Sequence, residues 1–105
     1  MAIRIETRVV ETGKAALSQL INKRPALVWW ITVCGKNTSS LAKLQIYNGM
    51  DAGGDYVWAT QNRAVRHYRF DPPIPCGMGI FVVSDSNVEL YTIAFEPIRK
   101  TPHKG

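Results

Sequence analysis

The run Leu27–Cys34, Leu-Val-Trp-Trp-Ile-Thr-Val-Cys, constrains the fold more than any other stretch of the chain. It is apolar and rich in β-branched and aromatic side chains, with Pro25 before it and Gly35 after it, which favours a buried strand over a helix. Strict alternation predicts two faces: Leu27, Trp29, Ile31 and Val33 on one, and Val28, Trp30, Thr32 and Cys34 on the other. Both faces are mostly apolar. We therefore expect a central strand covered by a second sheet on one side and by a neighbouring subunit on the other.

The rest of the chain breaks into short segments of alternating polarity, separated by turn-forming residues. The predicted strands are residues 3–10, 15–21, 41–47, 56–60, 65–70, 80–83 and 88–95. The last two are predicted to form a hairpin through the turn Ser84–Asn87. The proline-rich segment Asp71–Gly79 is predicted to be an extended crossover outside regular structure, because each proline lacks a backbone donor.

Seven or eight short strands and no helix predict an all-β protein. We expect a small antiparallel β-sandwich of jelly-roll or Greek-key type. A chain of 105 residues is large enough for one core, so residues 1–97 are expected to form a single domain. Its first part, 1–12, is expected to be an arm or edge strand, and 98–105 a basic tail.

Composition and cysteine usage limit the classes of function. The sequence has no apolar run long enough to cross a bilayer and no secretory signal, which predicts no membrane association and folding in a cytoplasm. Cys34 and Cys76 lack zinc-type and redox spacing, so both are expected to be reduced. The net charge of +5 permits an acidic partner without requiring one.

No arrangement of residues in the sequence predicts catalysis. His67 and His103 have no orienting carboxylate nearby, and Asp51 and Asp55 offer too few oxygen ligands for calcium. The glycines of residues 49–54 lack the lysine and helix of a phosphate-binding loop. We therefore expect no catalytic residue, no metal and no cofactor, and a protein that is not an enzyme.

Two binding functions remain as alternatives. Cations interleave with an aromatic residue at Arg63, Arg66, His67, Tyr68 and Arg69, a combination that could hold single-stranded nucleic acid in a small β-barrel. A second aromatic beside the charges is missing, which makes nucleic acid the weaker partner. The aromatic residues Tyr47, Tyr56, Trp58 and Tyr91 could instead form a sugar-binding platform.

Three segments in a fixed order carry a family resemblance. They are Leu44–Gly49 with the glycine-rich turn after it, Phe70–Val83 with its Pro-Pro-Ile-Pro crossover, and Ile93–Pro97 at the end of the last strand. In this order the chain resembles small β-sandwich virion proteins of tailed bacteriophages, although Asn48 stands where an aspartate is usual.

The resemblance implies a head decoration (cement) protein that binds and stabilises the capsid lattice as a homotrimer, or a tail or spike accessory. With the sugar-binding alternative, it would be a carbohydrate-binding receptor module of a tail fibre or spike. Its partner would be the major capsid protein or another virion protein, and its location the virion, assembled in the bacterial host cytoplasm. The family supplies no catalytic residue. Partner contacts are expected from the N-terminal arm, the cationic strand and the basic tail, at Ile3, Ile5, Arg8, Arg66, Arg69, Arg99 and Lys100.

Overall fold

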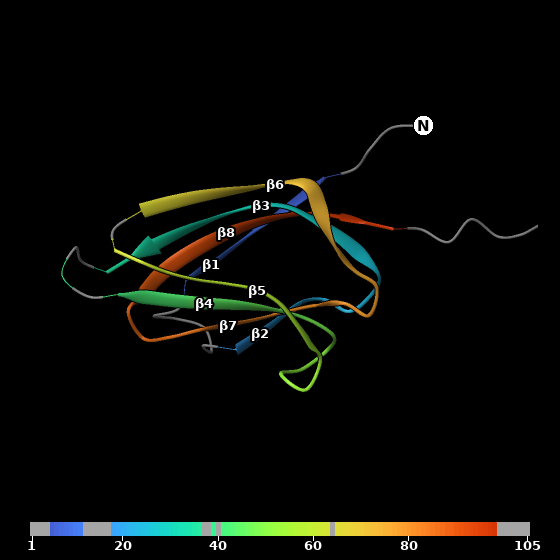
Figure 1. Cartoon of the computed structure of the whole chain (residues 1–105), viewed down its shortest axis with the longest axis horizontal. Coiled ribbons are helices and arrows are strands. Elements are labelled where there is room, and N and C mark those ends of the chain that lie inside the picture. Colours follow the sequence, from blue (N-terminus) through green and yellow to red (C-terminus); the bar gives the residue numbers. More distant parts are fainter. Residues whose placement is uncertain (1–4, 12–17, 37–38, 40, 64, 99–105) are drawn as a thin grey trace, which may run out of the picture.

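Eight strands form two four-stranded antiparallel sheets that pack face to face (Figure 1). The computed structural model describes residues 5–11, 18–36, 39, 41–63 and 65–98, and these include no helix. The strands are β1 (Glu6–Glu11), β2 (Ser18–Asn22), β3 (Ala26–Gly35), β4 (Ala42–Asn48), β5 (Asp55–Asn62), β6 (Val65–Cys76), β7 (Ile80–Ser84) and β8 (Val88–Pro97). The predicted all-β sandwich is confirmed.

The strand order is that of an eight-stranded jelly roll. Sheet A has the order β1-β8-β3-β6 and sheet B the order β2-β7-β4-β5, and every pair of neighbours is antiparallel. The chain changes sheet at almost every connection, as two interlocked Greek keys require. The predicted run Leu27–Cys34 lies in β3, a central strand of sheet A.

The core lies between the sheets and is made of aliphatic side chains. Val28, Ile31 and Val33 of β3 are fully buried, and Leu44 and Ile46 of β4 are fully buried opposite them. Burying one such side chain contributes about 1.5–3 kcal/mol. The sandwich therefore depends on the inward side chains of these two strands.

The predicted faces of β3 are wrong, because a β-bulge interrupts the strand at Trp29. Val28 pairs with Phe95 of β8, and the next paired residue, Trp30, faces Ala94. Trp29 is thus an extra residue, which shifts the alternation by one position. As a result Val28 shares the buried face with Ile31 and Val33, while both tryptophans lie on the opposite side of the sheet.

The proline-rich segment is part of a strand rather than a crossover. β6 continues through Pro72 and Pro73 to Cys76, bending sharply in its second half (Figure 1). β6 is an edge strand of sheet A, where one side of the backbone needs no partner, so prolines are tolerated. Four residues of β6 lie between the pairs Trp30–Arg69 and Val28–Ile74, where β3 has one, and this irregularity accommodates the bend.

The predicted hairpin of β7 and β8 is also wrong. β7 pairs with β2 and β4 in sheet B, whereas β8 pairs with β1 and β3 in sheet A. The connection is still a tight turn, in which the Val88 amide donates to the Asp85 carbonyl. Asp85 also donates its amide to the Lys43 carbonyl of β4. Turn composition predicted the reversal correctly, but pairing depends on which sheet each strand joins.

Candidate functional site

The outer face of sheet A is a candidate for a binding surface. Strand register aligns three rows of residues on this face across all four strands, and among them Ala94 is fully buried. The rows are Glu11–Leu90–Cys34–Val65, Val9–Thr92–Thr32–His67 and Thr7–Ala94–Trp30–Arg69. Leu27, Trp29 and Glu96 extend this face beyond the third row.

Both tryptophans on this face are fixed by neighbouring side chains. The Trp29 indole Nε1 donates a hydrogen bond of 3.1 Å to Glu96 Oε1. The Trp30 ring lies 5.3 Å from the His67 ring at a tilt of 44°, and His67 Nδ1 shares a hydrogen bond of 2.7 Å with Thr32 Oγ1. Because these contacts restrict the rotamers, the face has a rigid aromatic centre.

Charge is confined to the margin of this face. The central strands β3 and β8 contribute only apolar or uncharged polar side chains to it, apart from Glu96, which accepts from Trp29. Glu11 and Arg69 lie on the edge strands, as do the apolar residues Val9 and Val65, which are 59% and 62% exposed. An apolar aromatic centre with charged residues at the rim is the composition of a protein–protein interface.

The predicted contact residues are dispersed over the structure. Ile5 precedes β1 and is 48% exposed. The Arg8 guanidinium donates from Nη1 to the carbonyl oxygens of Leu20 and Ile21, at 3.2 and 3.4 Å, so it links β1 to β2 across the sandwich edge. Ile3, Arg99 and Lys100 lie outside the described residues.

The cationic strand does not form one patch. Arg66 pairs with the buried Val33, and Arg69 pairs with the outward Trp30, so the two exposed guanidinium groups leave β6 on opposite faces. The interleaved aromatic residue, Tyr68, is turned inward and accepts a hydrogen bond of 2.6 Å from Thr60. A single groove that both stacks bases and follows a phosphate backbone is therefore not built from these residues.

The predicted aromatic platform is likewise divided between the core and the surface. Tyr91 is fully buried. Trp58 is half-buried and packs edge-on against Tyr68 and Phe70, with ring centroids 5.0 and 5.2 Å apart, where it closes the sandwich between β5 and β6. Tyr47 and Tyr56 face outward from sheet B.

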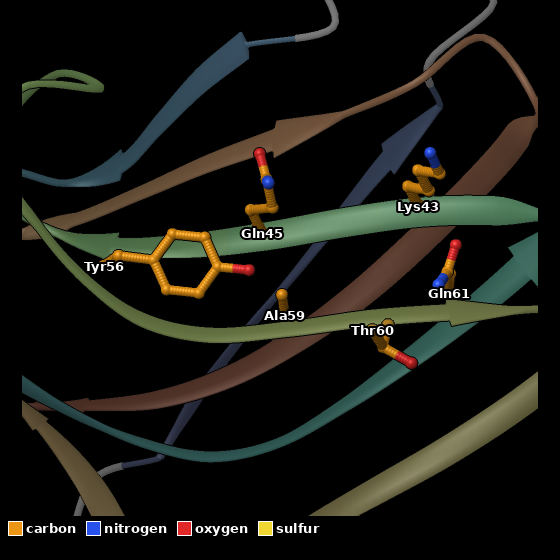
Figure 2. Close-up of a pocket in the computed structure, with 6 residues that line it drawn as sticks. All are labelled: Lys43, Gln45, Tyr56, Ala59, Thr60 and Gln61. Carbon is orange, nitrogen blue, oxygen red and sulfur yellow. The ribbon is translucent and has the colours of Figure 1, made fainter.

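A shallow hollow of about 310 Å³ lies beside Tyr56 on the outer face of sheet B. It is lined by Lys43, Gln45, Tyr56, Ala59, Thr60 and Gln61 (Figure 2). Figure 2 shows Ala59 between Tyr56 and Gln61, with the Tyr56 hydroxyl directed toward it. Sequence reasoning missed the hollow, because alternation placed Tyr56 and Ala59 on opposite faces.

The described residues include no candidate metal site. They contain no cluster of three or more His, Cys, Asp or Glu side chains that could hold a metal ion. Asp51 Oδ1 accepts from the Gly53 amide at 2.8 Å, and Asp85 Oδ1 accepts from the Asn87 amide at 3.0 Å. Both carboxylates therefore stabilise turns.

Both cysteines are free thiols at opposite ends of β3. Cys76 is buried beside Ala26, whereas Cys34 is half-buried on the outer face of sheet A. Ala26 and Cys34 are eight positions apart in β3, which corresponds to about 26 Å. A disulfide requires Cα atoms within about 7 Å, so this fold cannot join the two within one chain.

Comparison with known proteins does not assign the chain to a group. No protein-family model matches it, and no curated protein has a sequence significantly similar to it. Within the described part of the chain, no helix is long and apolar enough to cross a membrane.

Proposed function

We propose that the protein is a structural component of a tailed-bacteriophage virion, a head decoration protein that binds the capsid lattice as a homotrimer and catalyses no reaction. The observation that carries the proposal is the outer face of sheet A. On this face the central strands carry Leu90, Cys34 and two fixed tryptophans. A sheet face in contact with water would instead carry charged residues at such positions. The trimer and the capsid partner rest on the family resemblance of the sequence.

The jelly-roll order and the edge position of β1 support the same proposal. A jelly roll is an architecture found in virion proteins, although the fold by itself hosts many functions. β1 pairs with β8 and is an edge strand of sheet A. The chain leaves β8 at Pro97, and the Ile98 amide still donates to the Pro25 carbonyl at 2.9 Å.

Self-association is tested by a matched pair of charge insertions. Leu90→Lys places an ammonium on the outer face of sheet A, and Val83→Lys places one on the outer face of sheet B; both native side chains are half-buried. We expect the wild type and Val83→Lys to remain trimeric over a hundredfold dilution by light scattering. The Leu90→Lys trimer should dissociate at a protein concentration roughly tenfold or more above that at which the wild-type trimer dissociates, since an unpaired charge is costly inside an interface.

Cys34 gives an independent readout of the same face. Its alkylation by a thiol reagent should slow as the protein concentration rises, because the partner would cover it, while Cys76 should stay unreactive in the folded chain. A wild-type monomer at every concentration would refute the assembly proposed for this face.

Capsid binding is tested by co-sedimentation with purified capsids that lack the protein. We expect Arg66→Glu or Arg69→Glu to lower occupancy, and separate removal of residues 1–4 and 99–105 to abolish it. Light scattering must show that each variant is still trimeric, because Arg69 lies at the rim of the outer face of sheet A. Cutting inside β1 is avoided, because Val10 belongs to the core. Unchanged occupancy in all four variants would refute these contacts.

A further inference from the structure

The hollow on sheet B owes its shape to a second β-bulge. Ile46 of β4 pairs with Trp58, and the next residue, Tyr47, pairs with Tyr56. Val57 is therefore the extra residue, and Tyr56 and Trp58 face opposite ways. The bulge brings Tyr56 onto the same outer face as Ala59 and Gln61.

Two cross-strand pairs then line the hollow, and Tyr56 lies at one end of it. The pairs are Gln45–Ala59 and Lys43–Gln61. Ala59 has only a methyl group between two long side chains, so the surface is depressed at its position. The depression is a consequence of side-chain size on a rigid pair of strands.

An aromatic ring at one end of the hollow is held in place but remains open to solvent. Tyr56 is 57% exposed, and its ring meets the Tyr47 ring edge-on at 84°, with centroids 5.5 Å apart. This contact restricts the ring while leaving much of it uncovered. An exposed, preorganised tyrosine is a surface on which a flat ligand with weakly polar C–H groups can pack.

Groups that form hydrogen bonds surround this ring. The Tyr47 hydroxyl donates a long hydrogen bond of 3.4 Å to Gln45 Oε1, which leaves the Gln45 amide hydrogens available as donors. Gln61 supplies a second amide with both donor and acceptor, and Lys43 supplies an ammonium. Carboxamides that can donate and accept match neighbouring hydroxyl groups on a ring.

From this arrangement we propose that the hollow binds a saccharide residue, with one face of the sugar packed on Tyr56 and its hydroxyl groups bonded to Gln45 and Gln61. A ligand of purely apolar chemistry would leave both amides unsatisfied. At about 310 Å³ the hollow is at the small end of ligand sites, which suits a single sugar of a larger glycan. Lys43 lies where it favours a sugar with a carboxylate over a neutral one.

The proposed site is on the opposite outer face from the candidate interface. The outer face of sheet A and the outer face of sheet B are separated by the whole core. Association through sheet A thus leaves the hollow open to solvent. The sugar site does not depend on the virion assignment.

The experiment is an NMR titration of the full chain with glucose, N-acetylglucosamine and glucuronic acid at millimolar concentrations. We expect the side-chain amide signals of Gln45 and Gln61 and the ring signals of Tyr56 to shift, with glucuronic acid binding most tightly. If none of the three sugars shifts these signals, or if the shifts occur only on sheet A, the proposal is overturned.

Variants separate binding from folding. Tyr56→Ala should weaken binding roughly tenfold or more, because it removes the ring on which the sugar packs. Tyr56→Phe should keep most of the affinity, and Ala59→Leu should fill the hollow and abolish binding without touching the core. Equal affinity in Ala59→Leu and the wild type would overturn the proposal, whereas the light-scattering and capsid experiments would be unaffected by either result.

Discussion

Replacing Tyr91 by phenylalanine should stabilise the protein, although tyrosine-to-phenylalanine changes in a core usually destabilise it. The Tyr91 side chain is fully buried between the sheets, and its hydroxyl has no hydrogen-bond partner among the described residues. Burial also raises the pKa of this phenol well above its ordinary value, a shift that nearby Arg8 opposes. The hydroxyl is thus desolvated without compensation.

The magnitude follows from two opposing terms. An unsatisfied buried hydroxyl costs about 1–3 kcal/mol, and removing it recovers that cost. The void left by one oxygen is smaller than a methyl-sized cavity, which costs about 1 kcal/mol. We therefore expect Tyr91→Phe to raise the free energy of unfolding by about 1 kcal/mol, which corresponds to roughly 5 °C in Tm for a domain of this size.

Tyr68→Phe is the matched control, because it makes the same chemical change at a satisfied hydroxyl. The Tyr68 oxygen accepts a hydrogen bond of 2.6 Å from Thr60, so its removal should lower stability by about 1 kcal/mol. Both variants are compared with the wild type by urea unfolding at one protein concentration, since association adds to apparent stability. If Tyr91→Phe loses as much stability as Tyr68→Phe, the hydroxyl of Tyr91 is satisfied and the reasoning is wrong.

Two further predictions concern the buried thiol and a glycine turn. Burial raises the pKa of Cys76 from 9.0 to about 11. The unfolded chain therefore loses this proton first, and stability should fall by about 2–3 kcal/mol between pH 9 and 11. Urea unfolding across this range should show a smaller fall in Cys76→Ala, and an equal fall would contradict the assignment. Gly79 has φ = 121°, and a Cβ there would lie 2.8 Å from the Asn22 carbonyl oxygen. Gly79→Ala should thus cost about 1–3 kcal/mol in thermal unfolding, whereas Gly77→Ala, with open space around it, should change stability by less than about 1 kcal/mol; equal losses would show that the turn is not strained.

The sequence determined the class of fold, because alternation and turn residues are local properties. Ala42–Asn48 alternates cleanly and forms β4, and the glycine-rich residues 49–54 form the loop before β5, as predicted. The strand predicted at residues 15–21 is confirmed from Ser18 onward, within the strand Ser18–Asn22, while residues 15–17 lie outside the described residues. Each of these features is encoded within a few residues.

Pairing was decided by the tertiary structure. Nothing local in Ser84–Asn87 distinguishes a hairpin from a connection between sheets. β7 and β8 join different sheets because β7 pairs with β4 and β8 pairs with β3. The prolines of β6 are compatible with a strand because that strand lies at an edge. Position in the sheet is a property of the whole chain.

Both candidate surfaces depend on bulges that strict alternation cannot reveal. The bulge at Trp29 places both tryptophans on the outer face of sheet A, and the bulge at Val57 places Tyr56 beside Ala59 and Gln61 on sheet B. One extra residue reverses the facing of all residues that follow it in the strand. The sequence by itself thus determined that aromatic residues lie on strands, while the register between strands decided which of them reach the surface.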